Sequence, residues 1–205
     1  GTLVGNAAVT AGTRYLSLDG TGDRLDFADA PGFSFTSGGV DLPFSACAWV
    51  YLNSNSAANH NIIYKASASP LAVEWSLRSS NGATNDPAIV VFKSDVSAFI
   101  GRRTGSALST GAWHHLAGTY SSSKTTAGLK VYVNSVQSDT ANISSGTYTG
   151  MSDTAALLRI GGVDTGENVD GRIADVRIYS RELTQPEIAQ IYNAGAARIA
   201  QGGTP

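Results

Sequence analysis

Charged side chains are scarce in this sequence, at 15% of its 205 residues, where about a quarter is usual for a soluble domain. Lysine and arginine together number 14, against 16 acidic residues, and they form no basic cluster. Because phosphate contacts need clustered cations, we expect no nucleic-acid partner. Long apolar runs are also missing, and none approaches the roughly 20 residues that a membrane-spanning helix needs. We therefore expect no membrane span.

Cysteine is almost absent, since Cys47 is the single one in the chain. It cannot form an internal disulfide, and it lies within the apolar segment 45–50. We expect Cys47 to behave as a small buried hydrophobic residue. No local signature places a histidine and an asparagine around it, so a catalytic thiol is not indicated.

Glutamate is rare, and none of the glutamates has an acidic residue two positions away. The chain has only Glu74, Glu167, Glu182 and Glu187. A retaining glycosidase needs two carboxylates about 5 Å apart, and on a strand the residues that share a face are two apart. The sequence therefore predicts a protein that is not an enzyme.

The other titratable clusters do not indicate a catalytic site either. Asp164, Glu167 and Asp170 lie three residues apart in a glycine-rich segment, which fits either a solvated acidic loop or a contact to a ligand or cation. His114 and His115 are adjacent in a predicted strand. They must face opposite sides, so they cannot chelate one metal ion together.

Glycine is abundant, at 23 residues, and short apolar runs alternate with turn-forming segments along the whole chain. This rhythm is typical of an all-β sandwich rather than of alternating strands and helices. We expect strands at 15–18, 24–27, 46–52, 62–65, 73–78, 88–93, 112–120, 129–133, 157–161 and 172–179.

One helix is predicted near the C-terminus, over residues 186–194. Thr184 and Glu187 have the spacing of a capping box, and Pro186 suits the first turn. Ile188, Ile191 and Tyr192 form one apolar stripe, by which the helix should pack on the sandwich. Gly195 is expected to end the helix in a left-handed conformation.

Several segments, in this order, resemble the laminin-G-like jelly-roll family of concanavalin A-like domains. Residues 111–120 (Gly-Ala-Trp-His-His-Leu-Ala-Gly-Thr-Tyr) are similar to the family strand GQWHHVAVTY, and residues 129–134 (Leu-Lys-Val-Tyr-Val-Asn) are similar to LYVNG. Further similar segments are 1–6, 15–23, 44–50, 62–65 and 170–179. The resemblance implies a single domain over 1–205, folded as a concanavalin-A-like jelly-roll sandwich of two antiparallel sheets with one short C-terminal helix.

The same resemblance implies a structural calcium ion. In the family, the loop that matches 19–23 lies beside the acidic residue that precedes the segment Val-Arg-Ile-Tyr, and the two share the ion. The residues carried over are Asp19, Asp23 and Asp175. The turn 19–23 offers oxygen ligands of the kind that Ca²⁺ takes, although aspartate is also an ordinary turn former. The motif here reads Ala174-Asp175-Val176 where the family has Ile-Asp-Glu-Val, so the acidic position is shifted by one.

The sequence does not single out a ligand site. Sugar-binding sites combine an aromatic surface with side chains that hydrogen-bond to hydroxyls, and several residues have that chemistry. These candidates are Trp75, Tyr148, Arg102, Arg103, Asn168 and Asp164. Trp49 and Trp113 lie in well-matched strands, and we expect them in the core.

Two functions from different classes fit these observations. The first is a non-catalytic, calcium-stabilised binding module that recognises a glycan or a cell-surface or virion protein, as part of an extracellular, cell-surface or virion protein. The alternative is a structural decoration or fibre protein of a phage or cell surface that binds no glycan. Fold alone cannot separate them, and the sequence leaves the oligomeric state open.

Overall fold

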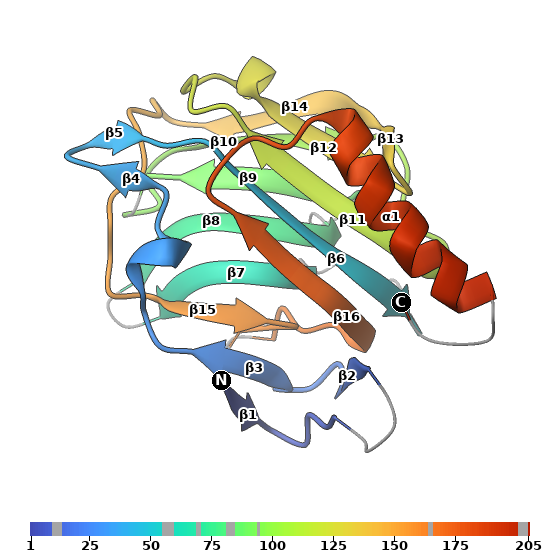
Figure 1. Cartoon of the computed structure of the whole chain (residues 1–205). Coiled ribbons are helices and arrows are strands. Elements are labelled where there is room, and N and C mark those ends of the chain that lie inside the picture. Colours follow the sequence, from blue (N-terminus) through green and yellow to red (C-terminus); the bar gives the residue numbers. More distant parts are fainter. Residues whose placement is uncertain are drawn as a thin grey trace.

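Two large antiparallel sheets pack face to face in the computed structural model, which describes residues 1–9, 14–54, 60–68, 71–80, 85–93, 95–163, 166–200 and 205 (Figure 1). The eight-stranded sheet has the order β1 (Thr2–Val4), β3 (Arg24–Phe27), β15 (Leu157–Ile160), β7 (His60–Ala68), β8 (Leu71–Ser80), β9 (Ala88–Phe92), β10 (Phe99–Thr104) and β14 (Asp139–Ser145). The six-stranded sheet has the order β13 (Val136–Gln137), β12 (Leu129–Val133), β11 (Trp113–Tyr120), β6 (Phe44–Leu52), β16 (Asp170–Tyr179) and β2 (Tyr15–Asp19). The predicted fold class is confirmed.

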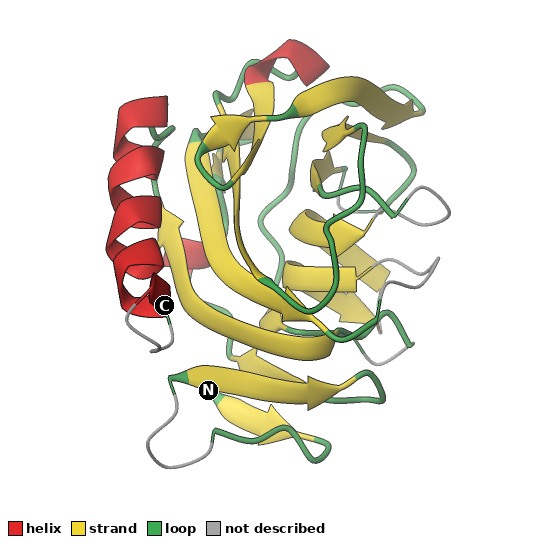
Figure 2. Ribbon diagram, turned by 90° about the vertical axis from the view of Figure 1, so that its right-hand side faces the viewer, coloured by secondary structure: helices red, strands yellow, loops and turns green. Residues whose placement is uncertain are grey.

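Shorter elements complete the fold. Strands β4 (Thr36–Ser37) and β5 (Val40–Asp41) form a small hairpin, and single 3-10 turns lie at Pro31–Phe33 and Thr126–Gly128. Helix α1 (Gln185–Ala200) covers the outer face of the six-stranded sheet, on the side away from the eight-stranded sheet (Figure 2). Among the described residues, no helix is long and apolar enough to cross a membrane.

Strand β6 is buried on both of its faces, which explains its unbroken apolar sequence. Phe44, Ala46, Ala48, Val50 and Leu52 point into the core between the sheets, since alternate residues of a strand share a face. The intervening residues lie under α1 or next to it, and Cys47 and Trp49 are each only 1% exposed. A strand covered on both faces needs apolar residues at nearly every position.

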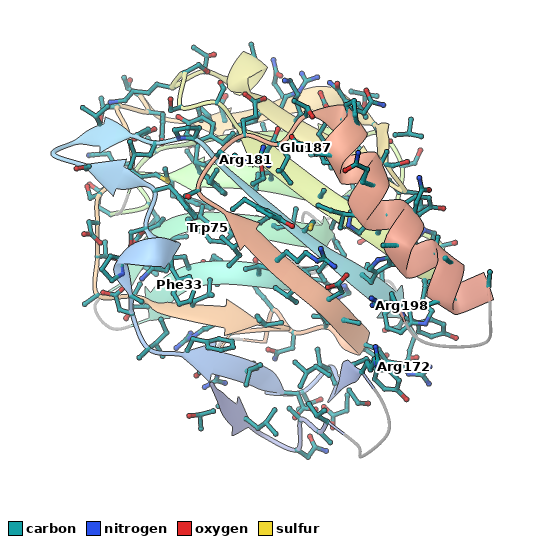
Figure 3. The ribbon with its side chains drawn as sticks, in the orientation of Figure 1. Phe33, Trp75, Arg172, Arg181, Glu187 and Arg198 are labelled. Atoms are coloured by element: carbon teal, nitrogen blue, oxygen red, sulfur yellow. The ribbon has the colours of Figure 1, made fainter. Side chains whose placement is uncertain are left out.

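Aromatic rings fill one end of the core. Phe35 and Phe44 stack with their centroids 4.4 Å apart, and the Phe44 ring lies 5.0 Å from that of Trp75. The indole Nε1 of Trp75 donates a 2.8 Å hydrogen bond to the carbonyl of Phe33 (Figure 3). Trp75 is completely buried. It therefore cannot stack on a sugar, and its inclusion among the sugar-site candidates is wrong.

Helix α1 begins at the predicted capping box. The amide and the hydroxyl of Thr184 both donate to the Glu187 carboxylate, at 2.8 and 2.9 Å. Arg181 donates to both oxygens of the same carboxylate (Figure 3). Glu187 thus fixes the first turn by accepting four hydrogen bonds, and Ile188 packs directly beneath it into a buried cluster.

The predicted end of the helix is wrong. The helix continues through Gly195 to Ala200, and Gly195 does not adopt a positive φ. Instead it lies against the indole of Trp49, where no β-carbon would fit. Glycine is needed here for close packing rather than for termination, and this requirement depends on a strand some 140 residues earlier in the chain.

Candidate functional site

A pocket of about 440 Å³ opens on the outer face of the eight-stranded sheet, toward its β14 edge. Strands β8, β9, β10 and β14 each contribute to its walls. The lining residues are Arg78, Val90, Phe92, Phe99, Asn142, Ile143 and Ser144. Four of these are apolar, and Arg78 carries a guanidinium. Asn142 and Ser144 pair with Arg102 and Ile100, so their side chains point to the face of β14 opposite Ile143.

The apolar part of the pocket is set by strand alternation. Val90 and Phe92 belong to the outer face of β9, whereas Ile89 and Val91 point into the core. The rings of Phe92 and Phe99 lie 5.6 Å apart at a tilt of 48°. Because the two strands are paired, with Phe92 opposite Phe99, their side chains form one continuous aromatic surface.

Arg78 is the charged group of the pocket. Its guanidinium lies over the Phe92 ring, 5.4 Å from the centroid, in the geometry of a cation–π contact. Its Nε donates to the Ser76 hydroxyl at 2.9 Å, which fixes the orientation of the side chain. Burial lowers the pKa of Arg78, while the charges of Tyr64 and Glu167 oppose that shift.

A polar strip continues the face from Arg78 across the sheet. Asn61 on β7 donates to Glu167 at 2.9 Å. Further along, Asp26 on β3 pairs with Arg24 at 3.1 Å and with Arg159 at 3.8 Å. Both carboxylates on this strip are therefore held by N–H donors.

This arrangement suits binding by stacking and hydrogen bonding. Ligand pockets of this size class are largely apolar, with a few polar groups that fix orientation. An aromatic surface matches the apolar C–H face of a sugar ring, and the Arg78 guanidinium lies beside it, where the edge of the ring carries hydroxyls.

The predicted calcium residues Asp19 and Asp23 do lie together in the turn after β2. Asp23 accepts the backbone N–H of Asn6 at 2.7 Å and that of Asp19 at 3.0 Å. Asp19 accepts the backbone N–H of Thr21 at 2.8 Å and the Asn6 amide at 3.0 Å. These hydrogen bonds, led by the one from Asn6, lower the pKa of Asp19.

Asp175 is not part of that turn, which corrects the prediction. Asp19 faces Asp170 in the register of β2 and β16, and Asp175 lies five residues further along β16. At a rise of about 3.3 Å per residue, the separation is roughly 16 Å. Asp175 sits in a bulge with φ 48° and forms an ion pair with Arg177 at 2.8 Å. Because the acidic position in this segment is shifted, Asp175 is not available as a calcium ligand beside Asp19 and Asp23.

The residues present do not fit a shared calcium site. Asp170, which takes the place facing Asp19, accepts hydrogen bonds from the side chains of Asn53 and Ser54, both at 2.8 Å. Every carboxylate oxygen of Asp19, Asp23 and Asp170 thus already faces an N–H or O–H donor. Within the described chain, no three His, Cys, Asp or Glu side chains are grouped so as to hold a metal ion.

The other sugar-site candidates from the sequence have structural partners. Arg102 pairs with Asp139, Arg103 pairs with Asp86, and Asn168 accepts the backbone N–H of Val163 at 3.0 Å. Tyr148 donates to the buried carboxylate of Asp41 at 2.7 Å. Asp164 lies outside the described residues.

Cys47 is buried, as predicted. Burial raises the pKa of its thiol to about 12, so the thiol is neutral at physiological pH and is a poor nucleophile.

Sequence reasoning missed the pocket because its residues come from four strands. Phe92 and Phe99 flank a short connection between β9 and β10, and Asn142 and Ile143 lie on a polar edge strand that gave no apolar alternation. The closely spaced phenylalanines were the one available signal.

The family model of the concanavalin A-like lectin/glucanase superfamily, Laminin_G_3, matches residues 19–189. No curated protein sequence matches this chain.

Several solved structures share the fold. Domain 4 of AbnA, an extracellular GH43 arabinanase from Geobacillus stearothermophilus in complex with arabinotriose, is 20% identical with a TM-score of 0.66, over 94% of this chain and 82% of that one. The receptor-binding domain of botulinum neurotoxin C/D mosaic serotype is 17% identical with a TM-score of 0.67, over 96% of this chain. The binding domain of Paraclostridial Mosquitocidal Protein 1 is 13% identical with a TM-score of 0.64, over 94% of this chain. This chain spans about half of each toxin domain, 46% and 47%. The sandwich topology and the match over most of the sequence together show that the chain belongs to the Laminin_G_3 family of the concanavalin A-like lectin/glucanase superfamily.

Proposed function

We propose that this domain is a non-catalytic carbohydrate-binding module, and that the pocket formed by β8, β9, β10 and β14 is its ligand site. The observation that carries the proposal is the pairing of the Phe92 and Phe99 rings with the Arg78 guanidinium in one pocket. The aromatic rings supply the apolar contact area on which a sugar ring can stack, and the Arg78 side chain is fixed beside them by its hydrogen bond to Ser76.

The absence of catalysis is part of the proposal. Hydrolysis with retention needs a free carboxylate nucleophile and a protonated acid about 5 Å apart. The carboxylates described on the outer face of this sheet include Asp26, Asp86 and Glu167. They are engaged by Arg24 and Arg159, by Arg103 and by Asn61, respectively. The face therefore offers polar contacts for binding rather than an acid and a nucleophile.

An extracellular, cell-surface or virion location follows as an expectation from this function. The similar structures include a domain of an extracellular arabinanase bound to arabinotriose and receptor-binding domains of toxins. A module that adheres to glycans or to cell-surface proteins is consistent with such neighbours.

The test is binding to a panel of neutral oligosaccharides that includes arabinotriose, measured by isothermal titration calorimetry. We expect Phe99→Ala and Ile143→Ala to weaken binding at least tenfold, because both side chains pack in the pocket. Asn193→Ala, an exposed residue of α1, is the matched control and should bind as the wild type does. Wild-type protein that binds no member of the panel, or pocket variants that bind normally, would contradict the proposal and favour the structural decoration or fibre role.

A further inference from the structure

Arg172 on β16 lies between two tyrosine rings on the outer face of the six-stranded sheet. Its guanidinium carbon is 5.1 Å from the centroid of Tyr15 and 4.9 Å from that of Tyr51. Both distances are within the range of a cation–π contact. The cation is thereby held in a defined place, near the start of β16 (Figure 3).

Trp113 completes this cluster. Its ring centroid is 6.1 Å from that of Tyr15 and 5.7 Å from that of Tyr51. The four residues come from β2, β16, β6 and β11, and all four are half-buried. We call Tyr15, Tyr51, Trp113 and Arg172 the aromatic platform. Trp113 was expected in the core, and it lies at the surface instead.

The polar groups of the platform have no partner in the part of the chain that the structure describes. Within the described residues, Arg172 forms no hydrogen bond and no ion pair, and the same holds for the hydroxyls of Tyr15 and Tyr51 and for the indole N–H of Trp113. None of these atoms is among the buried side-chain atoms that lack a hydrogen-bond partner, so they are accessible to solvent. The platform therefore presents a fixed guanidinium, two hydroxyls and one N–H to solvent.

Two carboxylates described on this face, Asp170 and Asp19, form no ion pair with Arg172. Asp170 shares the face because it lies two residues before Arg172 on β16, and Asp19 is its partner on β2. Asn53, Ser54, Asn6 and a backbone N–H occupy the oxygens of these two carboxylates. The guanidinium therefore retains its donors for an external group.

We propose that the aromatic platform is a second binding site, specific for a sugar that carries a carboxylate, such as a uronic acid. A planar guanidinium with free N–H groups matches a carboxylate in a bidentate arrangement. The aromatic rings beside it match the C–H face of the pyranose to which that carboxylate is attached. A simple inorganic anion would leave the rings unused, and a neutral sugar would leave the charge unpaired.

This site is independent of the pocket on the eight-stranded sheet. The two lie on the opposite outer faces of the sandwich, because Arg172, Tyr51, Trp113 and Tyr15 alternate with residues that enter the core. One site can fail without the other, so separate variants distinguish the two proposals.

The experiment measures binding of trigalacturonic acid and of its fully methyl-esterified form by isothermal titration calorimetry. The ester keeps the pyranose rings and removes the charge. We expect wild-type protein to bind the acid at least tenfold more tightly than the ester. Arg172→Gln should abolish this difference, Trp113→Ala should weaken both ligands, and Arg172→Lys should recover part of the preference for the acid.

Matched controls separate the platform from net charge and from folding. Arg181→Gln removes one exposed positive charge from the start of α1, and it should bind as the wild type does. Thermal melts show that each variant is folded, and Phe99→Ala should leave binding of the acid unchanged. Equal affinity for acid and ester, no binding of either, or an unchanged preference in Arg172→Gln would overturn the proposal. A dimer that dissociates on Arg172→Gln, without binding of the acid, would also overturn it and would assign the platform to self-association.

Discussion

Gly195 of helix α1 lies so close to Trp49 of strand β6 that a β-carbon at position 195 would be 2.3 Å from the indole Nε1. Tyr192, one turn earlier, stacks on the same indole with a centroid distance of 5.4 Å and an interplanar angle of 18°. The helix is thus held by an aromatic stack that requires the backbone itself to approach the sheet.

Gly195→Ala is expected to destabilise the protein by about 1–3 kcal/mol, the usual cost of overpacking a close contact. An alanine inside a helix is otherwise about 1 kcal/mol more favourable than a glycine. Urea unfolding shows whether the variant is less or more stable than the wild type. This sign decides whether the contact with Trp49 or the helix propensity of alanine dominates. A more stable Gly195→Ala variant would show that α1 is not docked on Trp49. Asn193→Ala, on the exposed side of the helix, should not be destabilised.

His115 should make the protein less stable in acid. Its imidazole is completely buried, neither ring nitrogen has a partner in the described structure, and burial lowers its pKa to about 4. In the unfolded chain the pKa is close to its ordinary value of about 6.5. Between these values the unfolded state binds the proton and the folded state does not, so stability falls as the pH drops from about 6.5 to 4, by up to about 3 kcal/mol.

The difference between wild type and His115→Phe isolates this effect, because phenylalanine fills the same space and does not titrate. We expect the variant to lose less stability than the wild type between pH 7 and pH 4, in urea unfolding at each pH. His114→Gln, at the neighbouring position, is the control and should keep the acid loss. Parallel pH profiles for wild type and His115→Phe would show that His115 is protonated in the folded protein.

Asp23→Ala is expected to lower stability by about 2–4 kcal/mol, because two backbone N–H groups would lose their charged acceptor. Asp23 is only 1% exposed, so water cannot readily replace it. Asp153→Ala, an exposed carboxylate on another loop, should have little effect. Thermal or urea unfolding of both variants gives the comparison.

Calcium is tested in the same melts. Because the oxygens of Asp19 and Asp23 already accept hydrogen bonds, we expect a chelator to leave the wild-type Tm unchanged. A bound ion would instead stabilise the folded state in proportion to the logarithm of its concentration over Kd. A Tm that falls by several degrees with chelator and returns with calcium would restore the calcium prediction.

Tyr148→Phe should reduce stability without affecting glycan binding. The carboxylate of Asp41, 2% exposed, accepts hydrogen bonds from Tyr120 at 2.6 Å, Tyr148 at 2.7 Å and the backbone of Met151 at 2.9 Å. Removing one donor to a buried charged acceptor costs about 1.5–3 kcal/mol. Loss of oligosaccharide affinity in a folded Tyr148→Phe protein would instead return Tyr148 to the ligand site.

Much of the fold could be predicted from the sequence, because core strands carry their own pattern. The apolar runs around Trp49, Val90 and Leu116 indicate strands wherever they occur. Strand β14 was missed, since an edge strand exposed along much of its length needs no apolar alternation. The extension of α1 past Gly195 was missed because it depends on a distant indole.

The sites were less predictable, because sequence does not say which face of a strand a residue occupies. Trp75 and Trp113 both lie in strands, yet Trp75 is in the core and Trp113 is half-buried at the surface. Asp175 precedes the predicted motif, but a bulge in β16 turns it toward Arg177. The neighbours that decide these roles lie on strands far away in the chain.

The outer wall of the pocket on the eight-stranded sheet has a practical consequence for how the protein is produced. Asn142, Ile143 and Ser144 line that pocket, and together they have the N-x-S form of an acceptor for N-linked glycosylation. The Asn142 side chain is exposed, so the secretory machinery of a yeast or mammalian host would be able to attach a bulky oligosaccharide there. Such material would carry an oligosaccharide on the edge strand that borders the pocket. Protein made in a bacterial cytoplasm carries no such group. Comparing it with the eukaryotic product, before and after enzymatic deglycosylation, measures how far the oligosaccharide hinders ligand entry.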